Sequence, residues 1–277
     1  MLPLFTRSIK FLVGLGFVGV LAISLIGTIS GLFTDPPQPT AEEEFHHHAK
    51  ELKLASDGPF GRFDKAQLQR GFLVYEKVCA ACHSLGLVSF RDLHALGYEE
   101  PEIKKIAKDW PIKQPTFDAK TGERAERDNL PSDRFPHVYY AGTGSPPDLS
   151  LMAKARHGGG AYIYSLLTGY EEHQPAELLR KFPGAKTGEG MFYNPYFANL
   201  NISMPPPLTA RDQVEYKDGT PATLDQMAKD VAAFLVWTAE PTMETRHRAG
   251  LAVVLFLLIT TILAYGAYLS VWRGVKH

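Results

Sequence analysis

Long runs without charge stand near both ends of the 277-residue chain, and a polar segment lies between them. The first run covers 11–34 and the second covers 249–272, so each has 24 residues. A helix rises about 1.5 Å per residue, and a helix of this length crosses the roughly 30 Å hydrocarbon core of a bilayer. The pattern predicts an apolar helix at each end and a polar domain over 35–248.

The C-terminal run is apolar on every face, has aromatic residues near its end and is followed by Arg273 and Lys276. Aromatic residues at the interface and basic residues beyond it are typical of membrane-spanning helices. The alternative is a buried helix of a soluble protein. We expect a transmembrane anchor over 249–272 and a cytoplasmic tail over 273–277.

The N-terminal run follows Arg7 and Lys10, as the apolar core of a secretory signal follows basic residues. However, 24 residues is long for a signal core, and no small-x-small cleavage site follows. A cleaved signal and a retained transmembrane helix are therefore equal alternatives for residues 1–34. Both predict a bacterial inner-membrane protein whose polar domain faces the periplasm.

Apolar residues recur at helical spacing in two parts of the polar domain. One helix is predicted over 64–81 with Asp64 as its N-cap, and another over 223–238 with Thr223 as its N-cap. Three shorter helices are also expected, over 98–110, 148–155 and 161–167.

The other segments lack this spacing. Three prolines and three glutamates in 35–44 predict an extended, charged linker. His46, His47 and His48 are consecutive and point in different directions, which favours a solvated linker over a metal site. Residues 184–220 are rich in Gly, Pro and Asn and predict a loop with a small hairpin. The domain is therefore expected to be mainly α with long loops.

Charge is sorted along the chain, although its net value is only −1. All 30 acidic residues lie between Asp35 and Glu244, whereas six of the 29 Lys and Arg lie outside that span. The span thus has 23 basic residues and a net charge of −7. Such a field attracts cationic partners and argues against nucleic acid, whose phosphates need a basic surface.

The two cysteines, Cys79 and Cys82, lie in a Cys-Ala-Ala-Cys-His motif that ends at His83. A thioredoxin-like pair would not need the histidine, and a zinc site would need two further ligands. C-x-x-C-H is the attachment motif of c-type haem. Positions i, i+3 and i+4 of a helix share a face, so both cysteines can reach one porphyrin edge while His83 lies beneath the iron. We expect one covalent haem c.

The sixth position of the iron decides what such a haem does. An open position serves catalysis or gas binding, whereas a thioether raises the potential and makes an electron carrier. Met204 is the favoured ligand because the three prolines after it fix the backbone of its loop. Ordinary core packing is the alternative role for Met204. Other candidate ligands remain open: Met152, Met191, Met227 and His157.

Further residues have both a functional and an ordinary interpretation. Arg156 could pair with a haem propionate or be a surface charge, and Tyr162 could bind a propionate or only pack. Pro146 and Pro147 could press on a haem face or only turn the chain.

Several blocks in order resemble the cytochrome c1 family, the haem subunit of the cytochrome bc1 complex (ubiquinol–cytochrome c reductase). The blocks besides the haem motif and Met204 are RGFLVY at 70–75, PPDLS at 146–150, ARHGG at 155–159, SLLTGY at 165–170, YNPYF at 193–197, DGTPAT at 218–223, AKDV at 228–231 and AEP at 239–241. The similarity extends from about Phe60 to the C-terminus and is weakest over 113–140.

The resemblance implies a mainly α, cytochrome c-like haem domain with long loop insertions and a C-terminal transmembrane helix. Cys79 and Cys82 would bind the haem, with His83 and Met204 as axial ligands. The remaining pocket residues would be Arg156 and Tyr162 facing the propionates, and Pro146, Pro147, Leu166 and Phe197 lining the walls.

The resemblance also implies a function. Electrons would arrive from the Rieske 2Fe–2S protein and leave to a cytochrome c. Cytochrome b would carry out the quinol chemistry, within a dimeric, proton-translocating oxidoreductase surrounded by membrane lipid. The alternatives are a stand-alone, membrane-anchored cytochrome c that serves another enzyme and a haem protein with an open iron.

Overall fold

A computed structural model of the chain describes residues 2–36, 38–142 and 144–275. The chain divides into two compact units after Glu44. Helix α1 (Leu2–Thr34) belongs to the first unit, and the short helix α2 (Ala41–Phe45) ends at the boundary. Residues Ser8–Thr34 are long and apolar enough to cross a membrane, which fits the signal and the anchor equally.

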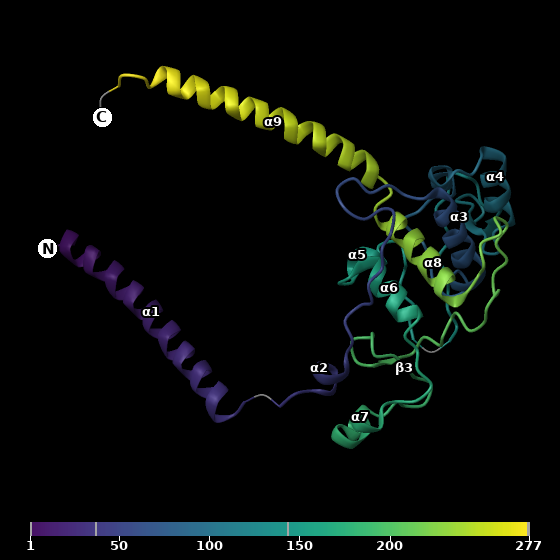
Figure 1. The fold of residues 1–277 in the computed structure, drawn as a ribbon, viewed down its shortest axis with the longest axis horizontal. Coiled ribbons are helices and arrows are strands. Elements are labelled where there is room, and N and C mark those ends of the chain that lie inside the picture. Colours follow the sequence, from purple (N-terminus) through teal and green to yellow (C-terminus); the bar gives the residue numbers. More distant parts are fainter. Residues whose placement is uncertain (1, 37, 143, 276–277) are drawn as a thin grey trace. The chain divides into compact units, whose positions relative to one another are not determined.

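The second unit is mainly helical (Figure 1), and its described residues also form two small antiparallel hairpins. Its helices are α3 (Lys65–Val74), α4 (Glu100–Asp109), α5 (Met152–Ala155), α6 (Gly159–Leu167), α7 (Ala176–Lys181), α8 (Leu224–Ala239) and α9 (Met243–Val271). Shorter turns are the π-helical η1 (Tyr75–Cys79) and the 3-10 helices η2 (Phe90–Leu96) and η3 (Pro183–Ala185). The hairpins pair β1 (Gln114–Phe117) with β2 (Arg124–Arg127), and β3 (Phe192–Tyr193) with β4 (Asn201–Ile202). The mainly α fold is confirmed.

The two long helices of the polar domain begin where their caps were predicted. The Asp64 carboxylate accepts hydrogen bonds from the backbone N–H groups of Ala66 and Gln67. The Thr223 hydroxyl accepts one from the Gln226 N–H. Each bond satisfies a donor that the first turn of a helix leaves unpaired. The shorter helices are also present, although α5 starts later and α6 starts earlier than expected, and β3 with β4 forms the expected hairpin.

The prediction of an extended linker over 35–44 is wrong at its end. Thr40 and Glu43 form a capping box: the Thr40 N–H donates to the Glu43 carboxylate at 2.9 Å, and the Glu43 N–H donates to the Thr40 hydroxyl at 3.3 Å. This reciprocal pair starts α2. His47 and His48 are exposed, as expected of a solvated segment, although the His47 N–H ties the backbone there to the Pro195 carbonyl at 2.8 Å.

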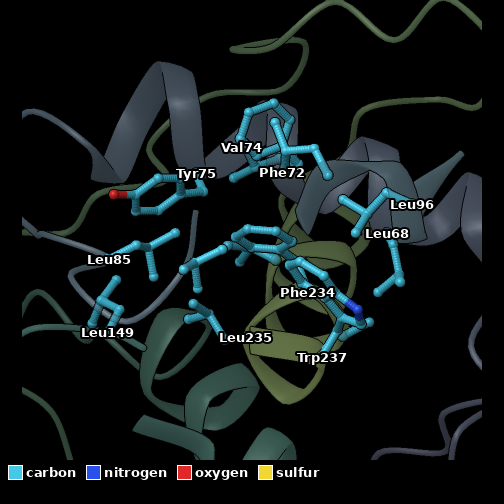
Figure 2. Close-up of a cluster of buried hydrophobic side chains, with 14 of the residues drawn as sticks. Leu68, Phe72, Val74, Tyr75, Leu85, Leu96, Leu149, Phe234, Leu235 and Trp237 are labelled. Atoms are coloured by element: carbon cyan, nitrogen blue, oxygen red, sulfur yellow. The ribbon is translucent and has the colours of Figure 1, made fainter. Parts of the chain in front are cut away.

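The core of the second unit lies where α3 crosses α8. A Cβ on Gly71 of α3 would collide with the Asp230 carbonyl and lie 2.7 Å from the Phe234 Cβ, so only glycine allows this approach. The rings of Phe72 and Tyr75 lie 5.7 and 5.8 Å from that of Phe234. Figure 2 shows these side chains in one buried cluster. The crossing fixes the direction in which α3 leads into η1.

A buried charge reinforces the crossing. Asp230 of α8 is fully buried, and its carboxylate accepts hydrogen bonds from Arg70 Nε at 2.9 Å and from Gln226 Nε2 at 2.8 Å. Arg70 also pairs with Asp218 at 2.6 Å. Removing one partner of such a group would leave a buried charge unpaired, which costs several kcal/mol. The ion pair between Arg70 of α3 and Asp230 of α8 therefore stabilises the crossing.

Helix α9 extends beyond the predicted apolar run into the polar domain. Near the start of α9, the Glu244 carboxylate accepts a hydrogen bond from the Phe63 N–H at 2.8 Å, and Arg246 pairs with Glu240 at 2.6 Å. The helix has 29 residues, its most apolar 18-residue stretch has a mean hydropathy of 2.3, and it fits a membrane anchor. Lys276, expected in the tail after it, lies outside the described residues.

Candidate functional site

The segment that leads to Cys79 changes its pitch. An α-helix was predicted through Ala81, but α3 ends at Val74 and η1 continues as a π-helical turn. The Ala80 N–H donates to the Tyr75 carbonyl at 2.8 Å, which closes the wider turn. At the start of this turn the Tyr75 ring is buried, and its hydroxyl donates to the His83 carbonyl at 2.9 Å. Such π-turns are frequent at functional sites.

A helical turn nevertheless brings the motif together. The N–H groups of Cys82 and His83 both donate to the Cys79 carbonyl, at 3.1 and 2.9 Å. Burial and, to a smaller extent, the neighbouring Cys82 raise the pKa of the Cys79 thiol to about 12. A redox-active thiol pair instead needs a lowered pKa. The site is therefore unlike that of a thioredoxin.

His83 is held by a backbone carbonyl. Its Nδ1 lies 2.8 Å from the Pro147 oxygen, and the proton is assigned to Nδ1 because a carbonyl only accepts. The pKa of His83 is lowered, and burial of the ring is the largest cause, so the ring is neutral at pH 7. Nε2 therefore keeps its lone pair, which is the form of histidine that binds a metal.

A cavity of about 610 Å³ adjoins the motif, a size typical of cofactor sites. It is lined by every residue that the sequence predicted for the haem pocket: Cys79, Cys82, His83, Pro146, Pro147, Arg156, Tyr162, Leu166, Phe197 and Met204. These residues come from segments far apart in the chain. One imidazole, two thiols and the thioethers of Met204 and Met152 line this single cavity, and such donors fit a c-type haem.

The structure leaves fewer candidates than the sequence for the second axial ligand. Met152 also lines the cavity. Among the described residues that line it, Met191, Met227 and His157 are not found. Met227 is fully buried in the core, and the sulfur of Met191 accepts a hydrogen bond from the Ser203 hydroxyl at 3.2 Å.

Arg156 and Tyr162 lie at the same part of the cavity. Burial raises the pKa of the Tyr162 hydroxyl, while the charge of Arg156 and a hydrogen bond to it oppose that rise. Arg156 is exposed, with its guanidinium donating to the Ala155 carbonyl at 3.0 Å. A cation beside a protonated phenol is suited to binding carboxylates.

Comparison with known proteins agrees with this geometry. The profile of the Cytochrome C1 family matches residues 54–275. The chain belongs to the cytochrome c1 family. This family is the haem subunit of the cytochrome bc1 complex, an oxidoreductase, and its members bind haem c. The resemblance predicted from the sequence is confirmed.

Relatives of the chain span bacteria and mitochondria. The chain is 42% identical to cytochrome c1 of Rhodospirillum rubrum, over 79% of this chain and 86% of the relative. It is 40% identical to "Cytochrome c1 1, heme protein, mitochondrial" of Arabidopsis thaliana, over 94% and 85%. It is also 39% identical to cytochrome b/c1 of Bradyrhizobium diazoefficiens, over 92% of this chain and 40% of that longer relative.

Some residues at this cytochrome c1 cavity were not predicted to lie there. Val231 and Leu235 of α8 form part of the cavity wall. The helical spacing of the apolar residues in α8 was the available signal. Tyr140 lines the cavity from the end of the segment with the weakest family resemblance. Other unforeseen lining residues are Lys77, Val78, Leu149, Ile163, Leu167, Ile202, Ser203 and Gln213.

Asp148 follows Pro147, whose carbonyl binds His83, and replacing it tests whether its hydrogen bonds stabilise the site. Its carboxylate accepts hydrogen bonds from the Gly86 N–H at 2.7 Å and the Ser150 N–H at 2.8 Å. We expect Asp148→Asn to lower the free energy of unfolding of the haem-loaded protein by about 1 kcal/mol, because one acceptor oxygen is lost. Thermal unfolding followed by haem absorbance measures this.

Asp118→Asn is the matched control, because Asp118 accepts a hydrogen bond from the Lys120 N–H at 2.8 Å in the exposed turn after β1. It should change stability by less than about 0.5 kcal/mol. Equal unfolding midpoints for the two variants would contradict the supporting role of Asp148.

Proposed function

We propose that this chain is the electron-relay subunit of a bc1 complex. It accepts single electrons from the Rieske 2Fe–2S protein and passes them to a cytochrome c through one covalently bound haem c. The observation that carries the proposal is that Cys79, Cys82, His83 and Met204 line one cavity. Bound there, haem supplies a one-electron redox change whose potential the axial ligands set.

Each part of the motif has a separate task. Cys79 and Cys82 form the thioethers that fix the group to the end of η1. His83 offers Nε2 to the iron, and the Pro147 carbonyl holds the ring through Nδ1. Met204 would offer its sulfur as the second protein ligand of the iron. Histidine with methionine raises the potential, as a relay toward cytochrome c requires.

The walls of the cavity orient the group and exclude water. Arg156 and Tyr162 bind the propionates. The apolar walls include Pro146, Pro147, Leu166 and Phe197, all of which line the cavity. A dry surrounding disfavours the extra positive charge of the oxidised iron and therefore also raises the potential.

The membrane and the partners follow from the rest of the chain. Residues 249–272 anchor the domain in a bacterial inner membrane, with 35–248 on the periplasmic side. The net charge of −7 over Asp35–Glu244 suits a cationic cytochrome c. The relative named cytochrome b/c1 joins the two names in one chain, which supports cytochrome b as the partner that oxidises quinol. The assembly is dimeric and translocates protons.

Purification tests this assignment against a stand-alone cytochrome. The full chain, carrying an affinity tag and extracted in mild detergent, should be recovered with a b-type cytochrome and a Rieske protein. The sample should reduce cytochrome c when quinol is added. Recovery of the chain alone, with quinol oxidation remaining in the untagged membranes, would favour the stand-alone alternative.

Replacing Met204 tests the axial ligand. Met204→Leu should keep the covalent haem, because the thioethers remain, but should lower the midpoint potential by on the order of 0.1 V, within the roughly 0.8 V that axial ligands control. The reduced variant should bind carbon monoxide, because its iron is open. Redox titration and carbon monoxide difference spectra measure both effects.

Met152→Leu is the control, because Met152 lines the same cavity and the exchange keeps the volume nearly constant. Its potential should stay near that of the unmodified protein. If Met152→Leu opens the iron and Met204→Leu does not, the ligand is Met152 and our assignment is wrong.

A further inference from the structure

The loop that carries Met204 has an unusual shortage of backbone donors. Pro205, Pro206 and Pro207 follow the methionine and have no N–H groups. These residues therefore cannot bind the loop to its neighbours through backbone donors. A hydrogen bond that holds the prolines of this loop must therefore run from a donor in another part of the chain to a carbonyl oxygen of the loop.

Tyr170 supplies such a donor. Its hydroxyl donates to the Met204 carbonyl at 3.0 Å, across 34 positions of the sequence. Burial raises the pKa of Tyr170, and nearby Tyr162 raises it further, so the hydroxyl keeps its proton. Among the described residues that line the cavity Tyr170 is not found, whereas Tyr162 is. Tyr170 thus acts on the loop from behind the cavity wall.

The end of α6 aims Tyr170 at the loop. A Cβ on Gly169 would collide with the Tyr196 ring and lie 2.6 Å from the Ser165 carbonyl, so a residue without a side chain is needed there. The same end of α6 is tied to the segment before Met204. The fully buried Asn194 donates through Nδ2 to the Leu166 carbonyl at 2.8 Å.

We propose that Tyr170 is a positioning residue that holds the sulfur of Met204 at the iron by binding the Met204 carbonyl. The proposal rests on the proposed function, in which Met204 is the axial ligand. It adds that the ligand loop is fastened to α6, the helix that also provides Tyr162 and Leu166 to the cavity. Without the hydroxyl, the loop can move away and the sixth position of the iron opens more often.

Imidazole binding to the ferric protein measures how often that position is open, because imidazole must displace the sulfur. The test uses the full chain in its detergent-solubilised complex. Tyr170→Phe should bind imidazole roughly threefold to tenfold more tightly, as expected for the loss of one ordinary hydrogen bond. Its covalent haem content should equal that of the unmodified protein, since the exchange removes a single oxygen atom.

Tyr164→Phe is the matched control. Tyr164 lies on α6, shortly before Tyr170, and its hydroxyl donates to Asp225 at 2.5 Å, so the variant loses a comparable bond that does not reach the ligand loop. Its imidazole affinity should be unchanged. Equal tightening in both tyrosine variants would mean general loosening of the domain and would overturn the proposal.

Met204→Leu distinguishes a failure of the Tyr170 proposal from a failure of the proposal that Met204 is the axial ligand. If Met204→Leu binds imidazole strongly while Tyr170→Phe behaves like the unmodified protein, the axial ligand is right and the role of Tyr170 is wrong. If Met204→Leu leaves imidazole affinity unchanged, Met204 is not the ligand, and the positioning role falls with it.

Discussion

Gly71 and Asp230 let α3 and α8 cross with their backbones in close contact, and the candidate haem site depends on that crossing. The crossing directs α3 into η1, at whose end Cys79 begins the motif. The face of α8 that packs against α3 continues through Val231 and Leu235 into the cavity wall. Asp230 is buried, and its carboxylate is bound to Arg70. Separating the two helices would remove this partner and leave an unpaired charge in an interior that solvates it poorly.

The two sides of the cavity are held in different ways. On the side of His83, helix packing and the Pro147 carbonyl fix the ligand. On the side of Met204, a loop without backbone donors at its prolines receives a side-chain hydrogen bond from Tyr170. Loops held by few bonds open at lower free energy than packed helices. The sulfur is therefore expected to be the ligand that is more easily displaced.

The sequence predicted what depends on local pattern and missed what depends on distant packing. Asp64 and Thr223 cap helices through bonds to residues two or three positions on, so their roles could be read locally. The π-helical turn of η1 starts at the buried Tyr75, and no periodicity encodes its pitch. The hydrogen bond from Tyr170 joins two segments that only the fold brings together. The capping box of α2 is the exception, because it is local, but the prolines and charges around it favoured an extended interpretation.

The most direct test of the central claim, that one cavity gives a haem iron both an imidazole and a thioether, is X-ray absorption at the iron edge of the ferric full chain after it has been separated from the Rieske protein and the b-type cytochrome, whose irons would otherwise contribute. A sulfur atom is expected in the coordination shell beside the nitrogens of the porphyrin and of His83. A shell that contains only nitrogen and oxygen would contradict the claim.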